Sequence, residues 1–68
     1  MARVIDLYYN FDSVEDFNRE KQNIIKNVCK WHAENETSGI LIYDILGMAI
    51  RFSFGSLEDA IAFKLLFL

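Results

Sequence analysis

The residues that could carry out chemistry in this chain are few, and they do not form a recognisable catalytic or metal-binding set. Cys29 and His32 lie three residues apart, and Glu36 follows one further turn along the chain. This spacing places two transition-metal ligands on one face of a helix, whereas a closed structural site takes about four. We interpret Cys29 as a buried thiol and His32 as an imidazole at a helix end, and expect neither a metal nor a cofactor.

Nucleophilic catalysis has equally little support in the sequence. Ser13 and Ser56 each precede two carboxylates, which is typical of a helix N-cap followed by an acidic first turn. The pairs Glu15-Asp16 and Glu58-Asp59 are adjacent in sequence, so their side chains point apart on a helix. The chain contains neither a G-x-S-x-G elbow nor a glycine-rich phosphate loop. We therefore expect no catalytic residues and no enzymatic activity.

Aromatic and basic side chains are the remaining candidates for ligand recognition. A small ligand or nucleotide would be bound by three tyrosines and one arginine, namely Tyr8, Tyr9, Tyr43 and Arg51. On the open face of a sheet, Tyr8 and Tyr43 could stack on the bases of a single-stranded nucleic acid. Asp6 opposes phosphate on that face, and we expect it to pair with Arg51 across the strands. This composition disfavours nucleic acid as the partner.

The size of the chain limits how much stability its core can supply. The 68 residues form one domain, residues 1–68, of 8.0 kDa, and 53% of them are hydrophobic. A domain of this size buries only about 60% of the surface that its unfolded chain exposes. Because a single cysteine excludes an internal disulfide, self-association is the remaining source of support. We expect a homodimer or a higher oligomer.

Charge and hydropathy argue against two further classes of partner. Seven Lys and Arg against ten Asp and Glu give a net charge of −3, which disfavours a sequence-independent grip on nucleic-acid backbones. The chain has no apolar run as long as the roughly 18 residues that a transmembrane helix needs, so we expect no membrane span. The single cysteine and the lack of a secretory signal are typical of a reducing compartment, and the expected location is the cytoplasm.

Hydrophobic periodicity predicts five secondary-structure elements. Residues 3–11 alternate with period two, which is typical of a strand. An amphipathic helix of about five to six turns follows Ser13, and residues 34–39 form the predicted loop. Lys21 fills one step of the helix's apolar stripe, whose other members are Val14, Phe17, Ile24, Val28 and Trp31. Residues 40–43 and 48–54 are predicted to pair as a hairpin around a loop at residues 44–47. The predicted core row of the second hairpin strand is Met48, Ile50, Phe52 and Phe54, and a second helix begins at Leu57.

The resulting order, β-α-β-β-α, belongs to the α+β class. The two predicted strand-to-helix junctions have similar sequences. Phe11-Asp12-Ser13-Val14-Glu15-Asp16 resembles Phe54-Gly55-Ser56-Leu57-Glu58-Asp59, at an offset of 43 residues. Either gene duplication or the same turn chemistry used twice explains this match. The order is that of the ferredoxin-like split β-α-β pattern with the fourth strand missing or reduced to a stub, and with both helices on one face. A right-handed crossover is expected to place the first strand parallel to the third and beside it, with the second strand on the third strand's far side.

Residues 57–68 are apolar on every side apart from Glu58, Asp59 and Lys64. A helix of this kind must be buried on more than one side, so a partner is needed unless the first helix covers it. Residues 65–68 are either helix or the stub of a fourth strand; if they are helical, the first strand is an unpaired edge. The predicted partner interface therefore comprises Val4, Asp6 and Tyr8 together with Ile61, Leu65, Leu66, Phe67 and Leu68.

The segment Ser56-Leu57-Glu58-Asp59-Ala60-Ile61-Ala62-Phe63-Lys64-Leu65 follows a strand that ends in Phe52-Ser53-Phe54. Its E-D-A-x-x-F-K-L pattern resembles the close of many short, mostly uncharacterised tailed-bacteriophage proteins. The resemblance implies a phage origin, a place in the host cytoplasm and control of a host protein or defence system. Our leading hypothesis is a non-enzymatic, self-associating protein-interaction module. The alternative is a domain that binds a small ligand, a nucleotide or single-stranded nucleic acid.

Overall fold

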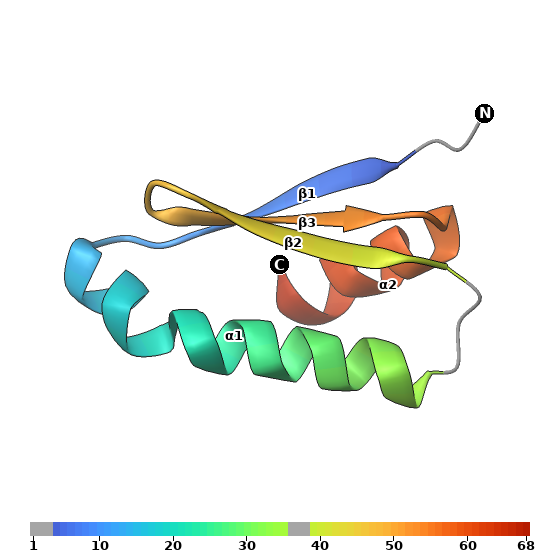
Figure 1. Ribbon diagram of the computed structural model, residues 1–68, viewed down its shortest axis with the longest axis horizontal. Coiled ribbons are helices and arrows are strands. Elements are labelled where there is room, and N and C mark those ends of the chain that lie inside the picture. The colour runs from blue at the N-terminus through green and yellow to red at the C-terminus, as the bar shows by residue number, and fades with distance from the viewer. Residues whose placement is uncertain (1–3, 36–38) are drawn as a thin grey trace.

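The computed structural model describes residues 4–35 and 39–68. It contains β1 (Ile5–Asn10), α1 (Val14–Glu34), β2 (Leu41–Leu46), β3 (Ala49–Phe54) and α2 (Leu57–Phe67), which confirms the predicted element order and the α+β class. Both helices lie on the same side of a three-stranded sheet (Figure 1). Arg3, the predicted start of the first strand, and residues 36–38 of the predicted loop lie outside the described residues.

The central strand of the sheet is β3, and it runs antiparallel to both of its neighbours in the order β1-β3-β2. The predicted neighbours are confirmed, whereas the prediction that the first and third strands are parallel is wrong. The crossover through α1 joins β1 to β2, and these two strands run in the same direction with β3 inserted between them. Because β3 returns from a hairpin with β2, it must oppose both strands.

The hairpin between β2 and β3 is tighter than the sequence predicts. Leu46 pairs with Ala49, so the turn consists of Gly47 and Met48. Gly47 has a φ of 60°, in the left-handed region that two-residue hairpin turns require and that glycine adopts without steric cost. Residues 44–46 therefore belong to β2 rather than to a loop. Met48 is exposed in the turn, outside the core row in which it was expected.

The core forms between β3 and the two helices. Ile50, Phe52 and Phe54 of β3 are fully buried on the helix side. Phe63 of α2 lies between the aromatic rings of β3, with centroids 5.0 Å from Phe52 and 5.1 Å from Phe54. Trp31 of α1 closes the cluster at 6.4 Å from Phe54. Burial of each such side chain contributes about 2 kcal/mol, so this cluster is the main source of stability.

The two helices follow their predicted patterns with one difference, at Val14. Phe17, Ile25 and Val28 form the buried face of α1, but Val14, which was expected in the same apolar stripe, is exposed. Lys21, which interrupts the stripe, lies with its ammonium group 4.9 Å from the centre of the Phe17 ring. Helix α2 extends to Phe67, so residues 65–67 are helical and do not form a strand.

The two junctions of the internal repeat are not equivalent. Ser13 is the N-cap of α1, and its Oγ accepts a hydrogen bond of 3.1 Å from the backbone N–H of Asp16. Ser56 occupies the N-cap of α2 with extended backbone, but its side chain makes no capping hydrogen bond. The predicted side-chain cap at Ser56 is therefore wrong. Only its carbonyl participates, as the acceptor of a 3.1 Å bond from the N–H of Ala60.

This difference predicts unequal effects from the same substitution. Ser13→Ala should lower the free energy of unfolding by about 1 kcal/mol, because it leaves an N-terminal N–H of α1 without its acceptor. Ser56→Ala is the matched control and should change the value by less than about 0.5 kcal/mol. Urea denaturation at one fixed protein concentration measures both values. Equal losses at the two positions would contradict the assignment.

Candidate interaction surfaces

The face of the sheet that points away from the helices is partly polar. Tyr8 lies opposite Arg51 in the register of β1 and β3, and Asp6 lies opposite Ser53. The hydroxyl of Ser53 donates a 2.6 Å hydrogen bond to Oδ1 of Asp6, while the guanidinium of Arg51 lies 3.3 Å from Oδ2 of Asp44. The predicted pair of Asp6 with Arg51 is therefore wrong, because the residue directly opposite Arg51 on β2 is Asp44.

The four residues predicted to bind a ligand do not share one surface. Tyr8 and Arg51 are neighbours on the open face. Tyr9 and Tyr43 lie opposite the buried residues Ile50 and Phe52, so both are on the helix side of the sheet. The tight turn fixes this register, and Tyr43 cannot join Tyr8 in a stacking platform. The open face thus offers one tyrosine where two were expected.

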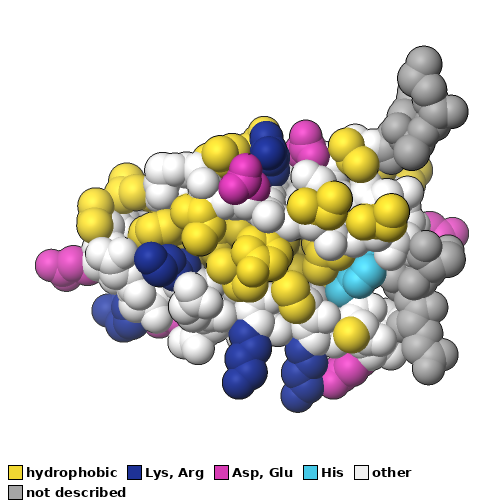
Figure 2. Space-filling view, in the orientation of Figure 1, with side chains coloured by type: hydrophobic (Ala, Val, Ile, Leu, Met, Phe, Trp, Pro, Cys, Tyr) yellow, Lys and Arg dark blue, Asp and Glu magenta, His cyan; other side chains and the backbone are white. Residues whose placement is uncertain are grey.

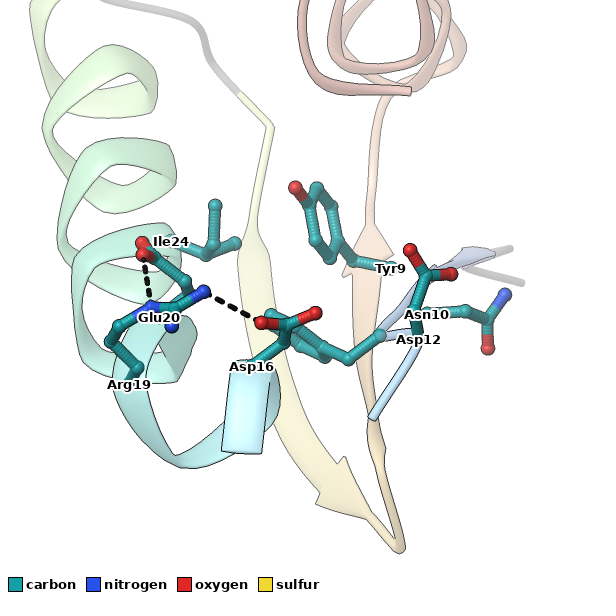
Figure 3. A pocket seen from close by; sticks show the side chains of 8 residues that line it. Tyr9, Asn10, Asp12, Asp16, Arg19, Glu20 and Ile24 are labelled. Carbon is teal, nitrogen blue, oxygen red and sulfur yellow. Dashed lines mark hydrogen bonds and ion pairs between the residues drawn. The ribbon is translucent and has the colours of Figure 1, made fainter. Parts of the chain in front are cut away.

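Tyr9 does line a cavity of about 310 Å³ at the end of β1 (Figure 3). The other lining residues come from the end of β1, from the following turn and from the first part of α1, and they are Asn10, Phe11, Asp12, Asp16, Arg19, Glu20 and Ile24. Arg19 binds two of the three carboxylates, at 2.6 Å from Asp16 and 3.2 Å from Glu20. The acidic lining disfavours a phosphate-bearing ligand.

Helix α2 has an apolar outer face. Leu65 is 81% exposed, and Leu66 beside it is also exposed. Phe67 differs from these, because its ring stacks on Phe63 at 5.3 Å and lies against the core. Four of the exposed large side chains recur at steps of four, four and three residues, and we call these four the α2 stripe: Leu57, Ile61, Leu65 and Leu68.

The outer edge of β1 has no partner strand in the described part of the chain. Three residues near this edge were predicted for a partner interface, and all are exposed: Asp6 and Tyr8 on β1, and Val4 just before it. Ile5, Leu7 and Tyr9 alternate with the exposed positions and are partly buried against the core. The helix layer therefore covers one face of β1 and leaves its outer edge accessible.

The other edge strand, β2, carries an apolar surface that the sequence analysis did not identify. Ile42 and Leu46 are exposed on the open face, and Tyr43 and Ile45 are exposed on the helix side. Figure 2 shows hydrophobic side chains gathered in the region between β2 and α1. The nearly uninterrupted apolar run of residues 40–46 was the available signal. Assigning residues 44–46 to a loop concealed it.

A buried carboxylate and a partly buried imidazole link the two helices. Asp59, a first-turn carboxylate of α2, is only 4% exposed. Its Oδ2 lies 3.3 Å from Nε2 of His32. Gly39 approaches the same carboxylate so closely that an added Cβ would lie 2.6 Å from Oδ2. His32, in the last turn of α1, therefore faces α2. The backbone at Gly39 can lie here because this residue carries no side chain.

The described residues offer no metal site. Cys29 is partly buried against the core, and Glu36 lies outside the described residues. In residues 4–35 and 39–68, no group of three or more His, Cys, Asp or Glu side chains is placed to hold a metal ion. Within the same ranges, no helix combines the length and the apolar character needed to cross a membrane.

Comparison with known proteins does not assign this chain to a family. No family model matches the sequence, and neither a curated protein nor a solved structure is significantly similar to it. The resemblance of the C-terminal segment to phage proteins stays a prediction.

The contact of His32 with Asp59 predicts a defined pattern of stabilities. His32→Ala should lower the free energy of unfolding by about 2 kcal/mol, because it removes a partner from a buried carboxylate. Adding Asp59→Asn to this variant removes the charge at nearly constant shape and should restore part of the loss. Urea denaturation of the two variants measures both effects. A further loss in the double variant would contradict an ionic contribution.

Proposed function

We propose that this protein is a non-enzymatic protein-interaction module that self-associates through the α2 stripe. One observation carries the proposal: α2 is apolar on two sides, and the sheet covers one of them. Its inner side places Ala60 and Phe63 in the core, while its outer side presents Ile61 and Leu65 to solvent. Contiguous exposed apolar surface on a small protein is typical of an interaction site.

A second copy of the chain is the occupant that this surface fits best. The α2 stripe itself contains no charged residue, so two stripes can meet without bringing like charges together. Steps of four, four and three residues keep the stripe on one side of the helix, as helix-to-helix packing requires. Burying a leucine side chain contributes about 2 kcal/mol. In a symmetric dimer each residue of the α2 stripe is buried in both copies, so its contribution to association counts once for each copy.

The resemblance of residues 56–65 to phage proteins supports a more specific role. On this basis the module is a phage-encoded regulator or inhibitor, and it binds a host protein in the host cytoplasm.

The element order and the strand order β1-β3-β2 also support a ferredoxin-like split β-α-β fold without its fourth strand. In the complete pattern, the fourth strand lies beside the first. The outer edge of β1 is the corresponding position here, and the residues that could have formed the strand instead complete α2.

A ligand-binding function is the alternative, and its specific support is the placement of Tyr8 beside Arg51 on the open face. Asp6 and Asp44 lie on the same face, and Arg51 is already paired with Asp44. We therefore expect nucleotides to leave the melting temperature unchanged in a thermal-shift screen, since only a specific ligand stabilises the folded state. Saturable binding of labelled single-stranded RNA or DNA at low salt would favour the alternative instead.

Self-association through α2 is tested by a charge at the centre of the exposed surface. Leu65→Glu should weaken self-association by at least about tenfold, because each copy would bury a carboxylate without a partner. Lys64→Gln is the matched control, since it changes the net charge by the same amount at the adjacent exposed position. Sedimentation equilibrium measures both. If the two variants associate alike, the α2 stripe is not the contact surface.

A further inference from the structure

We propose that the outer edge of β2 pairs with the same edge of a second copy, which joins two three-stranded sheets into one six-stranded antiparallel sheet. This contact is separate from the α2 stripe, so it goes beyond the proposed function and adds a second surface for association. Its basis is the direction of the backbone groups on β2, the apolar character of the strand and the register in which two copies meet.

The backbone of β2 has unpaired hydrogen-bonding groups along its outer edge. The N–H of Gly55 donates a 2.8 Å hydrogen bond to the carbonyl of Ile40, one residue beyond the pair Leu41 and Phe54. Hydrogen-bonded pairs alternate along antiparallel strands, so the even-numbered residues of β2 direct their backbone groups at β3. Leu41, Tyr43 and Ile45 direct theirs outward, where the described chain provides no strand.

The side chains of β2 do not protect this edge. Natural edge strands discourage pairing with lysine, proline, bulges or inward-pointing charges. β2 contains one charged residue, Asp44, which is already 3.3 Å from Arg51. Tyr43 is 46% exposed and Ile45 is 41% exposed, although both are on the helix side of the sheet. A further strand would cover this apolar surface.

The strand is complementary to itself in one register. With Tyr43 on the two-fold axis, Leu41 lies opposite the partner's Ile45, and apolar side chains meet along the helix side. On the open face, Asp44 lies opposite the partner's Ile42 and stays beside its own Arg51. The two strands then overlap over residues 40–46 and form a closed, isologous contact.

Other registers are less favourable. A shift of two residues toward the turn would place Asp44 directly opposite the partner's Asp44, and like charges at that spacing are destabilising. The opposite shift leaves Ile45 and Leu46 beyond the end of the partner's strand. A shift of one residue would join the helix side of one sheet to the open face of the other. A second copy in the Tyr43-centred register is therefore the occupant that β2 fits.

A proline at a position whose backbone N–H points outward tests the pairing of β2 with a second copy without disrupting the sheet of the single chain. Tyr43→Pro removes an N–H that would bond the partner but leaves the bonds between β2 and β3 intact. Tyr8→Pro is the matched control on the other edge. The 3.3 Å bond from Phe11 N–H to the Met48 carbonyl fixes the alternation on β1, and the Tyr8 N–H points outward. Circular dichroism confirms that each variant is folded.

Sedimentation velocity of these variants separates the two contacts. With both contacts present, the wild-type chain should form an assembly larger than a dimer. Tyr43→Pro and Leu65→Glu should each give a dimer, their combination should give a monomer, and Tyr8→Pro should match the wild type. A dimeric wild type that is unchanged by Tyr43→Pro and dissociated by Leu65→Glu would overturn the β2 contact alone.

The remaining outcomes are equally distinct. A wild-type dimer that resists Leu65→Glu but dissociates with Tyr43→Pro would support the β2 contact and contradict association through the α2 stripe. Loss of assembly with Tyr8→Pro but not with Tyr43→Pro would show that β1, and not β2, pairs with the second copy, and would overturn the proposal. A monomeric wild type at high concentration would overturn both contacts.

Disulfide cross-linking tests the register without proline. In a Cys29→Ala background, which removes the natural cysteine, Tyr43→Cys should form a covalent dimer on mild oxidation. Its two Cα atoms would lie about 5.5 Å apart, within the range of a disulfide. Ile45→Cys should stay monomeric on a denaturing gel, since its counterpart would be about 13 Å away along the strand. Equal cross-linking of the two variants, or of Ile45→Cys alone, would overturn the register.

Discussion

Phe63 joins the sheet to both helices. Its ring lies within 5.3 Å of Phe52, Phe54 and Phe67, and Trp31 of α1 reaches it at 6.5 Å. Because these large side chains are concentrated under the central strand, β3 is fully buried on its inner face while both edge strands receive less cover. A chain of this size cannot supply a second aromatic layer. The exposed surfaces of α2 and β2 are therefore a consequence of where the core lies.

Much of the fold could be predicted because its signals are local. The alternation of Ile5, Leu7 and Tyr9, the cap at Ser13 and the apolar face of α1 depend on residues a few positions apart. The hairpin was harder, because Asp44 resembles a turn residue when its neighbours in space are unknown. Its carboxylate is instead held by Arg51 across the strands. The direction of β1 was misjudged for a related reason, since β3 is inserted between the two strands that the crossover joins.

The interaction surfaces also differ in how far the sequence predicts them. The outer face of α2 could be predicted from composition, because a helix that is apolar all round has more apolar surface than one sheet can cover. Contacts between distant residues gave no such signal: Asp59 and His32 come from different helices, and Phe67 turns inward although its neighbours Leu66 and Leu68 are exposed. The edge of β2 depends on knowing the strand order, which local patterns do not contain.

The order of the elements along the chain also has a consequence for protein synthesis. β1 and α1 precede β3 in the chain, yet β3 is the strand with which β1 pairs, and Phe63 comes later still. While the ribosome makes residues 1–48, the apolar sides of β1 and α1 have no sheet against which to pack. Such a nascent chain exposes the surface that chaperones bind. The native pairing of β1 and the aromatic packing beneath the sheet can therefore form only after β3 and α2 have been made.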